Sequence, residues 1–332
     1  MGKVKIGFIG VGGIGSVHVE NVSKIEDAEI VAICDVNAEN AAKKAQELGL
    51  SRFYTDVDDL LESEALDGVF ICVPPFAHGD IEEKVVKKGI HLLVEKPVSL
   101  NLVDAYSKLE TINNSGVINA SGYCLRYIDV LDQAKTYLSD KKIAMVRGHY
   151  LSSFVPTPWF REKDKSGGQI VEQATHVVDL IRYLAGDING VYADMHLDTL
   201  KDIEGINIPD VSSVNVTFDS GAIGHLDSTL IQPDHRAAVE LLGLDYRVEV
   251  SFTSVTITEK GKEKRVYTAD SDFYYNQDAA FIKAIQEKDQ SLILANFEEG
   301  VKTLAVTLAA NKSAETSERV NLDTFTEAQL MI

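Results

Sequence analysis

The stretch of sequence that decides the fold is Lys5-Ile6-Gly7-Phe8-Ile9-Gly10-Val11-Gly12-Gly13-Ile14-Gly15, near the start of the chain. An apolar run ends in a Gly-x-Gly-x-x-Gly motif, a helical pattern follows, and a second apolar run ends in Asp35. This order is typical of a dinucleotide-binding strand–turn–helix unit. Gly10 permits the tight turn, Gly12 lets a pyrophosphate approach the backbone, and Gly15 lets the helix pack close to its strand.

The same segment predicts which groups would hold the cofactor. The N–H groups of Gly13 and Ile14 lie at the start of the helix, where the positive end of its dipole favours phosphate. Asp35 falls twenty residues after Gly15, where a carboxylate accepts hydrogen bonds from both ribose hydroxyls. The two residues after Asp35 are Val and Asn, so no Arg stands there to meet a 2′-phosphate, and we expect NAD rather than NADP. The alternative is a plain glycine-rich turn with an unrelated Asp, because three glycines at this spacing also arise by chance.

Length and composition limit the class of protein. The chain has 332 residues, enough for two domains, and 45% of them are hydrophobic. Its net charge of −19 argues against a nucleic acid or an anionic membrane as partner. The sequence shows neither an apolar run of membrane-spanning length nor a leader pattern. The three cysteines, Cys34, Cys72 and Cys124, lack CxxC spacing and fall in or just after apolar runs, which predicts reduced thiols that fill the core of a cytoplasmic protein.

The pattern of elements predicts two domains of the α/β class. Residues 1–122 alternate strand and helix patterns, which predicts a doubly wound parallel sheet, a Rossmann fold, with its ligand at the carboxyl ends of the strands. Residues 123–332 are predicted to form an α+β domain with a large, mostly antiparallel open sheet of about six to eight strands. The expected strands of the first domain are Val4–Ile9, Glu29–Cys34, Gly68–Val73, His91–Val94 and Val117–Ala120, and the expected helices are Ile14–Ile25, Ala38–Leu48, Val57–Glu62, His78–Lys88 and Leu102–Asn113.

In the second domain, period-two runs rich in Val, Ile and Thr indicate the antiparallel strands, and Asp219-Ser220-Gly221 is predicted to be a hairpin turn. The expected strands include Ala144–Leu151, Ser212–Phe218, Ala222–Leu230, Val239–Leu244 and Arg247–Phe252, and the expected helices are Val130–Leu138, Gln169–Ala185, Tyr274–Glu287 and Glu298–Ser313.

Two motifs follow predicted strands of the first domain, at the edge where a dinucleotide would bind. In the first motif, Val73, Pro74 and His78 are expected near the cofactor, with a purely structural role for the histidine as the equal alternative. In the second, Glu95-Lys96-Pro97, Glu95 is expected to contact the cofactor and Lys96 to point toward the nicotinamide end. Hydride transfer at a carbinol carbon builds alkoxide character on the oxygen, which the Lys96 ammonium would stabilise or protonate. The alternative is a surface lysine beside a proline turn.

A third motif places polar groups on one face of the predicted helix 169–185. At 100° per residue, Glu172, His176, Asp179 and Tyr183 fall within about 60° of one another, and apolar residues occupy the opposite face. His176 is the expected general base, with Glu172 and Asp179 to orient it. The alternative is a simple contact between residues four apart on a helix. We predict no metal site, because no second His or Cys follows at zinc-ligand spacing.

Together, three motifs resemble the Gfo/Idh/MocA oxidoreductase family: the glycine motif with Asp35, Glu95-Lys96-Pro97, and Gly167-Gly168 leading to His176-x-x-Asp179. The resemblance covers the whole chain. It implies a Rossmann domain, then an α/β domain whose open sheet commonly joins subunits into dimers or tetramers, and hydride transfer between NAD(P) and a sugar or cyclitol hydroxyl. Lys96 and His176 match the family's catalytic lysine and histidine. Polyol members commonly have Asp four residues before that histidine; Glu172 stands there in this chain, which suggests a subgroup other than the inositol enzymes.

The resemblance also points to residues that line the crevice. Arg161 is expected to contact the cofactor. Trp159, in the same loop, is a candidate for the substrate site, with core packing as the equal alternative. The weaker candidates for contacts with substrate are Arg126, Tyr127 and Tyr274.

We therefore expect an NAD-dependent dehydrogenase of CH–OH groups that acts on a small polyhydroxylated molecule and forms a homodimer or homotetramer. One alternative is a glycosidase of the same fold that uses NAD as a transient oxidant. The other is a non-enzymatic NAD(H)-responsive binding protein, against which the presence of both Lys96 and His176 argues. Net production of NADH separates the dehydrogenase from both.

Overall fold

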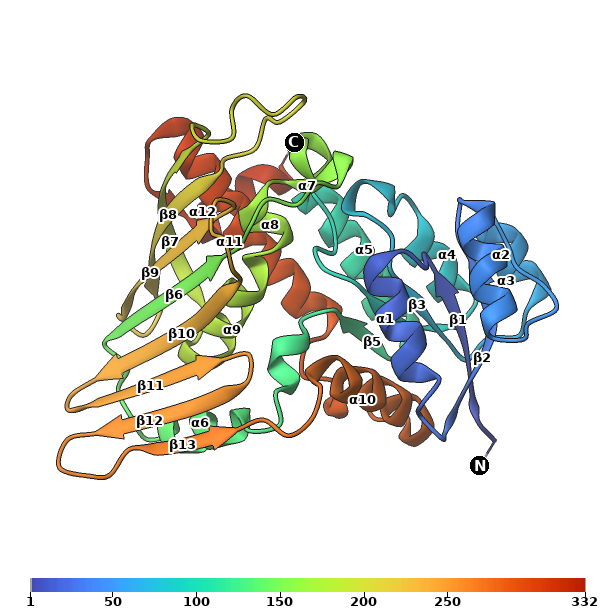
Figure 1. Ribbon diagram of the computed structural model, residues 1–332, viewed down its shortest axis with the longest axis horizontal. Helices are drawn as coiled ribbons and strands as arrows, with labels where there is room; N and C mark the ends of the chain where they lie inside the picture. The colour runs from blue at the N-terminus through green and yellow to red at the C-terminus, as the bar shows by residue number, and fades with distance from the viewer. Residues whose placement is uncertain (1, 332) are drawn as a thin grey trace. The chain divides into compact units, whose positions relative to one another are not determined.

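The computed structural model describes residues 2–331, and the chain divides into two compact units (Figure 1). The first contains residues up to 127 together with 272–301, and the second contains 128–271 and the residues from 302 onward. This division differs from the predicted boundary after residue 122, since 123–127 and the returning segment 272–301 belong to the first unit. Each unit is described by itself below.

The first unit is built on a five-stranded parallel sheet with the order β2-β1-β3-β4-β5, which confirms the predicted Rossmann domain. The chain moves outward from β1 to β2 and then crosses back to β3, so right-handed crossovers put helices on both faces. The order reverses between β1 and β3, and ligands of such sheets bind where the order reverses, at the carboxyl ends of the strands. The strands are β1 (Val4–Ile9), β2 (Ala28–Cys34), β3 (Gly68–Ile71), β4 (His91–Val94) and β5 (Asn119–Ser121).

Helices follow the strands at nearly the predicted positions, because the residues that cap them lie next to them in the sequence. Asn37 and Asp56, for example, accept hydrogen bonds from the first N–H groups of α2 and α3 through their side chains. The helices are α1 (Gly13–Val22), α2 (Ala38–Glu47), α3 (Val57–Ser63), α4 (Ile81–Lys87) and α5 (Leu102–Ser115), with the short 3-10 turns η1 (Pro75–Ala77) and η2 (Cys124–Tyr127).

A helix from late in the chain, α10 (Phe273–Glu287), completes this unit. The ring of Phe281 meets that of Phe70 edge-on at 5.3 Å, inside the core of the parallel sheet. Gly68 in β3 is required at this contact, because a Cβ there would lie 2.8 Å from Cδ1 of Ile285. The short turn η4 (Gln290–Leu292) and the first residues of α11 (Phe297–Thr316) also belong to this unit.

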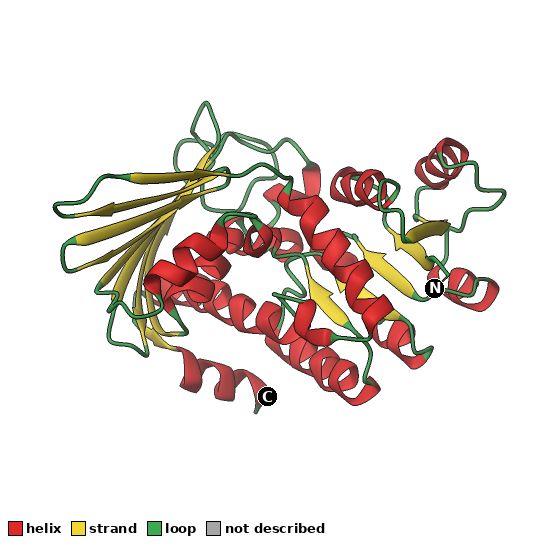
Figure 2. Cartoon of the chain, turned by 90° about the horizontal axis from the view of Figure 1, so that it is seen from below, coloured by secondary structure: helices red, strands yellow, loops and turns green. Residues whose placement is uncertain are grey.

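The second unit is built on a nine-stranded sheet with the order β13-β12-β11-β10-β6-β9-β8-β7-β14, whose twist is visible in Figure 2. All pairs are antiparallel except β6 with β9. The predicted class of sheet is confirmed, and the predicted hairpin turn joins β8 to β9. The strand number exceeds the predicted six to eight, because edge strands as short as β13 and β14 show no clear period-two pattern. The strands are β6 (Met145–Leu151), β7 (Ile188–His196), β8 (Val211–Phe218), β9 (Ile223–Thr229), β10 (Arg236–Gly243), β11 (Tyr246–Ser251), β12 (Ser254–Glu259), β13 (Arg265–Thr268) and β14 (Val320–Asn321).

Helices α6 and α9 pack on this sheet. Gly148 in β6 allows a close approach, because a Cβ there would lie 2.9 Å from side-chain atoms of Val177 and Ile181 in α9. The face of β6 and β9 that does not meet α9 carries Met145 and Ile223, both exposed. The helices of this unit are α6 (Leu131–Leu138), α7 (Lys163–Ser166), α8 (Gln169–Glu172), α9 (Thr175–Ala185), the larger part of α11 and α12 (Leu322–Leu330), with η3 (Pro158–Arg161).

The predicted helix 169–185 is wrong in one respect: it is two helices, α8 and α9, with a break at Gln173 and Ala174. The N–H groups of both break residues donate to the Gln169 carbonyl, and the His176 N–H donates to the Gln173 carbonyl, so the regular helical pattern is interrupted. The side chain of Gln169 donates to the Thr229 carbonyl oxygen at 2.8 Å and to Oγ of Ser152 at 3.1 Å. These contacts tie α8 to the sheet independently of α9.

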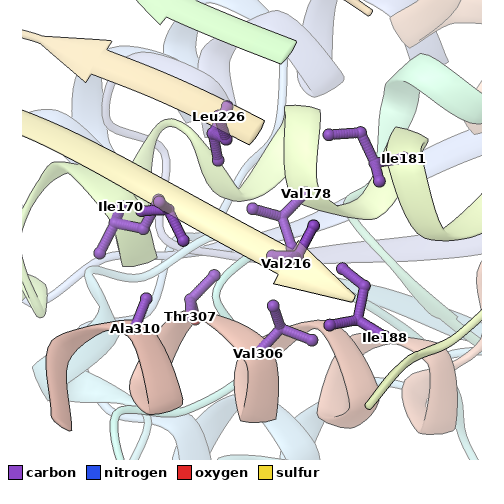
Figure 3. A pocket seen from close by; sticks show the side chains of 10 residues that line it. Ile170, Val178, Ile181, Ile188, Val216, Leu226, Val306, Thr307 and Ala310 are labelled. Atoms are coloured by element: carbon purple, nitrogen blue, oxygen red, sulfur yellow. The ribbon is translucent and has the colours of Figure 1, made fainter. Parts of the chain in front are cut away.

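A small cavity lies in the core of the second unit (Figure 3). Its wall is apolar, with side chains from α8, α9, the sheet and α11, among them Ile170, Val178, Ile181, Val216 and Val306. At about 10 Å³ it has room for one water molecule at most. It is a packing gap and not a substrate site. Among residues 2–331, every helix is too short or too polar to cross a bilayer.

Candidate active site

The glycine loop after β1 has the shape that a pyrophosphate needs. Gly10 has φ of +88°, and a Cβ there would lie 2.6 Å from the Cys72 carbonyl oxygen. A Cβ on Gly15 would collide with the Gly10 carbonyl oxygen. By contrast, the space above Gly12 and Gly13 is open, with no heavy atom within 4 Å of the Cβ position. The loop is therefore closed toward the protein and open where a phosphate would approach.

The N-terminus of α1 suits an anion. Gly12 is the N-cap, no side chain caps the helix, and its first turn contains no acidic residue. The first hydrogen bond of the helix runs from the Ser16 N–H to the Gly12 carbonyl oxygen. The N–H groups of Gly13, Ile14 and Gly15 before it point along the helix axis toward an incoming ligand.

Asp35 stands at the carboxyl end of β2 and is fastened to the glycine loop. Its Oδ2 accepts the Val11 N–H at 2.9 Å, and its Oδ1 accepts the Asn37 N–H at 2.9 Å. Each oxygen keeps a lone pair for a further donor. Together with the open glycine loop, this carboxylate fits the ribose and pyrophosphate of a dinucleotide.

The motif Glu95-Lys96-Pro97 follows β4 directly. The Glu95 N–H donates to the Ile71 carbonyl oxygen at 2.9 Å, which keeps the backbone in the sheet one residue beyond the strand. Val73 and Pro74 follow β3, the neighbouring strand, so both motifs emerge at the same sheet edge. The Lys96 ammonium group is thus carried on a backbone that the sheet holds firmly.

His78 belongs to a buried ionic network. Its Nδ1 contacts Oε1 of Glu82, whose Oε2 lies 3.1 Å from Nζ of Lys108, and Lys108 also pairs with Asp104 at 3.2 Å. The network joins α4 to α5. The geometry therefore favours the structural interpretation of His78, and a contact with cofactor stays a prediction.

Arg126 and Tyr127 brace the returning segment of the first unit. Arg126 donates to the Leu294 carbonyl oxygen at 2.6 Å and to Oε2 of Glu299 at 2.9 Å. The Tyr127 hydroxyl accepts the Leu294 N–H at 2.9 Å. Both side chains are buried, so this geometry favours a structural role over the predicted contact with substrate. Tyr274 lies in the first turn of α10, with its ring edge-on to that of His18 at 6.0 Å.

In the second unit, His176 lies in the first turn of α9 and is 8% exposed. Asp179, one turn later, is fully buried, and its Oδ1 accepts a hydrogen bond from the Thr303 hydroxyl of α11 at 3.0 Å. Glu172 is half-buried at the end of α8, across the helix break. The predicted common face therefore holds within α9 for His176 and Asp179, but helical spacing does not place Glu172. Tyr183 accepts a hydrogen bond from Lys135 of α6 at 2.8 Å.

Trp159 and Arg161 connect two loops of the second unit. Arg161 donates to the Glu204 carbonyl oxygen at 3.0 Å and to that of Pro156 at 2.8 Å. Trp159 packs on a small apolar cluster formed by Phe160, Ile208 and Leu230. The core-packing interpretation of the tryptophan is favoured, and the predicted cofactor contact of Arg161 stays a prediction.

Three groups of polar or aromatic residues have no local signal in the sequence. One is an aromatic cluster of Tyr150, His235 and Phe252, with ring centroids 4.9 Å and 5.5 Å apart, which forms because β6, β10 and β11 are neighbours. The second is Gln169 with Ser152. The third is His18 with Asp278, which are 260 residues apart in the chain. Among residues 2–331, no group of three His, Cys, Asp or Glu side chains is arranged to hold a metal ion.

Comparison with known proteins agrees with this geometry. Residues 4–123 match the oxidoreductase family with an NAD-binding Rossmann fold, and residues 142–258 match the GFO/IDH/MocA C-terminal domain. The chain belongs to the GFO/IDH/MocA oxidoreductase family. The family resemblance of the three motifs is therefore confirmed, and the chain is an NAD(P)-dependent dehydrogenase.

Individual relatives match over nearly their full length. Myo-inositol 2-dehydrogenase of Thermotoga maritima is 28% identical over 334 residues, which cover 96% of this chain and 99% of the relative. The crystal structure of a probable dehydrogenase from Thermotoga maritima superposes with a TM-score of 0.83 at 26% identity, over 97% of this chain and all of the other. Levoglucosan dehydrogenase, in complex with NADH and L-sorbose, shares the fold with a TM-score of 0.87 at 18% identity, over 97% of this chain and 99% of that one.

Proposed function

We propose that the enzyme transfers hydride between NAD and a secondary hydroxyl or keto carbon of a neutral sugar or cyclitol. The observation that carries the proposal is the pairing of an open glycine loop with Asp35 in a family whose relatives include an inositol dehydrogenase and a levoglucosan dehydrogenase. Glu172 before the catalytic histidine supports a substrate other than inositol itself.

The preference for NAD over NADP is supported at Asp35. Its carboxylate, held by the N–H groups of Val11 and Asn37, offers acceptors to a ribose diol. The same negative charge would repel a 2′-phosphate. Val36, the next residue, is 92% exposed and offers no cation in its place.

One residue is proposed to move the proton, and three others assist it. When bound, NAD accepts the hydride at its nicotinamide ring. His176 takes the proton of the substrate hydroxyl as general base, and Asp179 together with Glu172 holds the imidazole in position. The Lys96 ammonium stabilises the negative charge that develops on the oxygen. In the reverse direction the same groups return the proton to the carbonyl oxygen.

The test is a panel of inositols, aldoses, anhydrosugars and sugar acids, each mixed with purified protein and either NAD or NADP. A dehydrogenase makes NADH in proportion to the substrate consumed. An NAD-using glycosidase would consume a glycoside without net NADH. A binding protein would change neither. Absence of NADH across the panel, with tight binding of NAD, would contradict the proposal.

We also propose that the protein works as a homodimer or homotetramer in the cytoplasm. Assembly through the large sheet is supported by Met145 and Ile223, which lie opposite each other on β6 and β9 and are 41% and 53% exposed. A reducing compartment is supported by three buried cysteines that form no disulfide, Cys34, Cys72 and Cys124.

A further inference from the structure

A buried cluster of charges joins three segments of the first unit that are far apart in sequence. His18 comes from α1, Glu95 follows β4, and Asp278 comes from α10. The imidazole Nε2 lies 3.0 Å from Oε1 of Glu95, and Nδ1 lies 2.8 Å from Oδ1 of Asp278 and 3.0 Å from its Oδ2. His18 and Asp278 have no exposed surface, and Glu95 is 4% exposed. Each ring nitrogen faces a carboxylate, so both nitrogens donate and the ring is an imidazolium.

The ionisation of the ring follows from its two partners. Burial by itself would lower the pKa of His18, but the charges of Asp278 and Glu95 and the hydrogen bonds to them outweigh burial and raise it to about 10. Burial raises the pKa of Asp278 above its ordinary value, against the pull of His18. Because Asn21 also donates to Oδ2 of Asp278 at 3.3 Å, the second carboxylate is held from two sides.

The cluster reaches the Lys96 backbone through Glu95. The second oxygen of that carboxylate, Oε2, accepts the Lys96 N–H at 3.2 Å. The neighbouring Gly122 leaves room for it, since a Cβ at that position would lie 2.6 Å from Cδ of Glu95. The carboxylate is therefore clamped between an imidazolium on one side and the Lys96 amide on the other.

We propose that His18 and Asp278 are positioning residues for Lys96. They hold the Glu95 carboxylate, which in turn keeps the backbone at Lys96 in one orientation. The orientation of the ammonium group thus depends on a chain of charged contacts that runs from α10 through α1 to the end of β4. The inference rests on the proposed role of Lys96. Buried ion clusters add little net stability compared with apolar side chains of the same size, so orientation is the effect that this cluster supplies.

The chain offers a matched control. Lys108 is also a buried cation, 1% exposed, between two carboxylates in the same unit, at 3.1 Å from Glu82 and 3.2 Å from Asp104. Replacing it with methionine removes a cation from an ionic cluster that joins α4 to α5 and contains none of His18, Glu95 and Asp278. Lys108→Met should thus show the cost of a broken buried cluster without a loss of positioning.

The first experiment needs no substrate. Hydrogen–deuterium exchange is measured at the amides of Val94, Glu95, Lys96 and Val98 in the wild type, His18→Gln, Asp278→Asn and Lys108→Met. We expect the Lys96 amide to exchange at least about tenfold faster in His18→Gln and Asp278→Asn, because its acceptor is no longer held, and at the wild-type rate in Lys108→Met. Asp278→Asn is isosteric and serves if His18→Gln does not fold. Wild-type exchange in Asp278→Asn would overturn the inference.

The second experiment measures turnover well below the unfolding temperature. We expect kcat to fall about 10- to 100-fold in His18→Gln and Asp278→Asn, with the Kd for NAD within about twofold of wild type, and to be unchanged in Lys108→Met. On a Lys96→Met background, neither substitution should lower the residual turnover further. Independent, multiplying losses would overturn the positioning role. Full turnover in Lys96→Met would instead contradict the proposed role of Lys96. The exchange experiment would still test whether His18 and Asp278 hold the Lys96 backbone, because it does not depend on turnover.

Discussion

At the scale of single residues, the hydrogen-bond partners of each polar side chain distinguish candidate site residues from structural ones. Asp179 is buried and bound to Thr303, and Asp35 is bound to the glycine loop, so both carboxylates are held in place. The guanidinium groups of Arg126 and Arg161 donate hydrogen bonds to backbone carbonyl oxygens, which is typical of structural arginines. In the sequence, motif spacing indicated Asp35 and Asp179, whereas only the family resemblance pointed to Arg161 and, more weakly, to Arg126.

His176→Ala tests the proposed general base. Loss of the imidazole removes proton transfer but leaves the glycine loop and Asp35 intact, so kcat should fall about 10²- to 10⁴-fold while the Kd for NAD stays nearly constant. The measurements are steady-state NADH formation with the substrate found in the panel, and titration with NAD. Wild-type kcat in the variant would remove His176 from the mechanism.

The charged state of His18 predicts a pH dependence of stability. Its pKa is raised from 6.5 to about 10 in the folded protein, so the folded state binds one more proton than the unfolded state between these values. This contribution is fully present below about pH 6.5 and is lost as pH rises through about 10, by about 1.4 kcal/mol per pH unit for one proton. The midpoint of urea unfolding should therefore fall between pH 7 and 10 more steeply in the wild type than in His18→Gln. Parallel pH profiles would show that the ring is neutral in the folded state.

At the scale of elements, the helices show what periodicity predicts and what it omits. The strands and helices of the parallel sheet start and end close to their predicted positions, because caps and glycine turns are local signals. Helix α10 was also predicted at almost its observed bounds, but as part of the second domain. An amphipathic pattern says that one face is buried; it does not say against which sheet.

The core beneath α9 predicts a cost for truncating its apolar face. Ile181 is 2% exposed and lines the small cavity of the second unit. Ile181→Ala would enlarge a gap that the surrounding elements already fail to close, and should lower the free energy of unfolding by about 2–5 kcal/mol. Urea denaturation measures the change. A loss below about 1 kcal/mol would mean that α9 moves to fill the space. Ile181→Val, which removes a single methyl group, is the graded control and should cost less than Ile181→Ala.

At the scale of the whole molecule, the two faces of the large sheet have different surroundings. The face that meets α9 belongs to the core, and the other face bears Met145 and Ile223 beside charged residues such as Arg147 and Asp227. The adjacent exposed apolar side chains of Met145 and Ile223 are the observation that supports the proposed assembly through this face.

Introducing positive charges on this face tests whether the protein assembles through it. Met145→Lys together with Ile223→Lys places two cations on adjacent strands, which should dissociate an oligomer into monomers without unfolding the sheet, since both side chains are exposed. Light scattering coupled to size-exclusion chromatography gives the mass. Val103→Lys, a similarly exposed apolar residue on helix α5 of the first unit, is the control that should leave the mass unchanged. An unaltered mass in the double variant would place the interface elsewhere.

The sequence by itself determined the parallel sheet, its glycine loop with Asp35, the antiparallel class of the second sheet and the motifs around Lys96 and His176. All of these depend on residues close together in the chain, where turn geometry, capping and hydrophobic period act. Only the tertiary structure decided that α10 joins the first unit, that the helix carrying His176 breaks after Glu172, and that His18 bridges the carboxylates of Glu95 and Asp278. Each of these depends on contacts between residues far apart in the chain, and a contact of that kind leaves no period or motif in a single sequence.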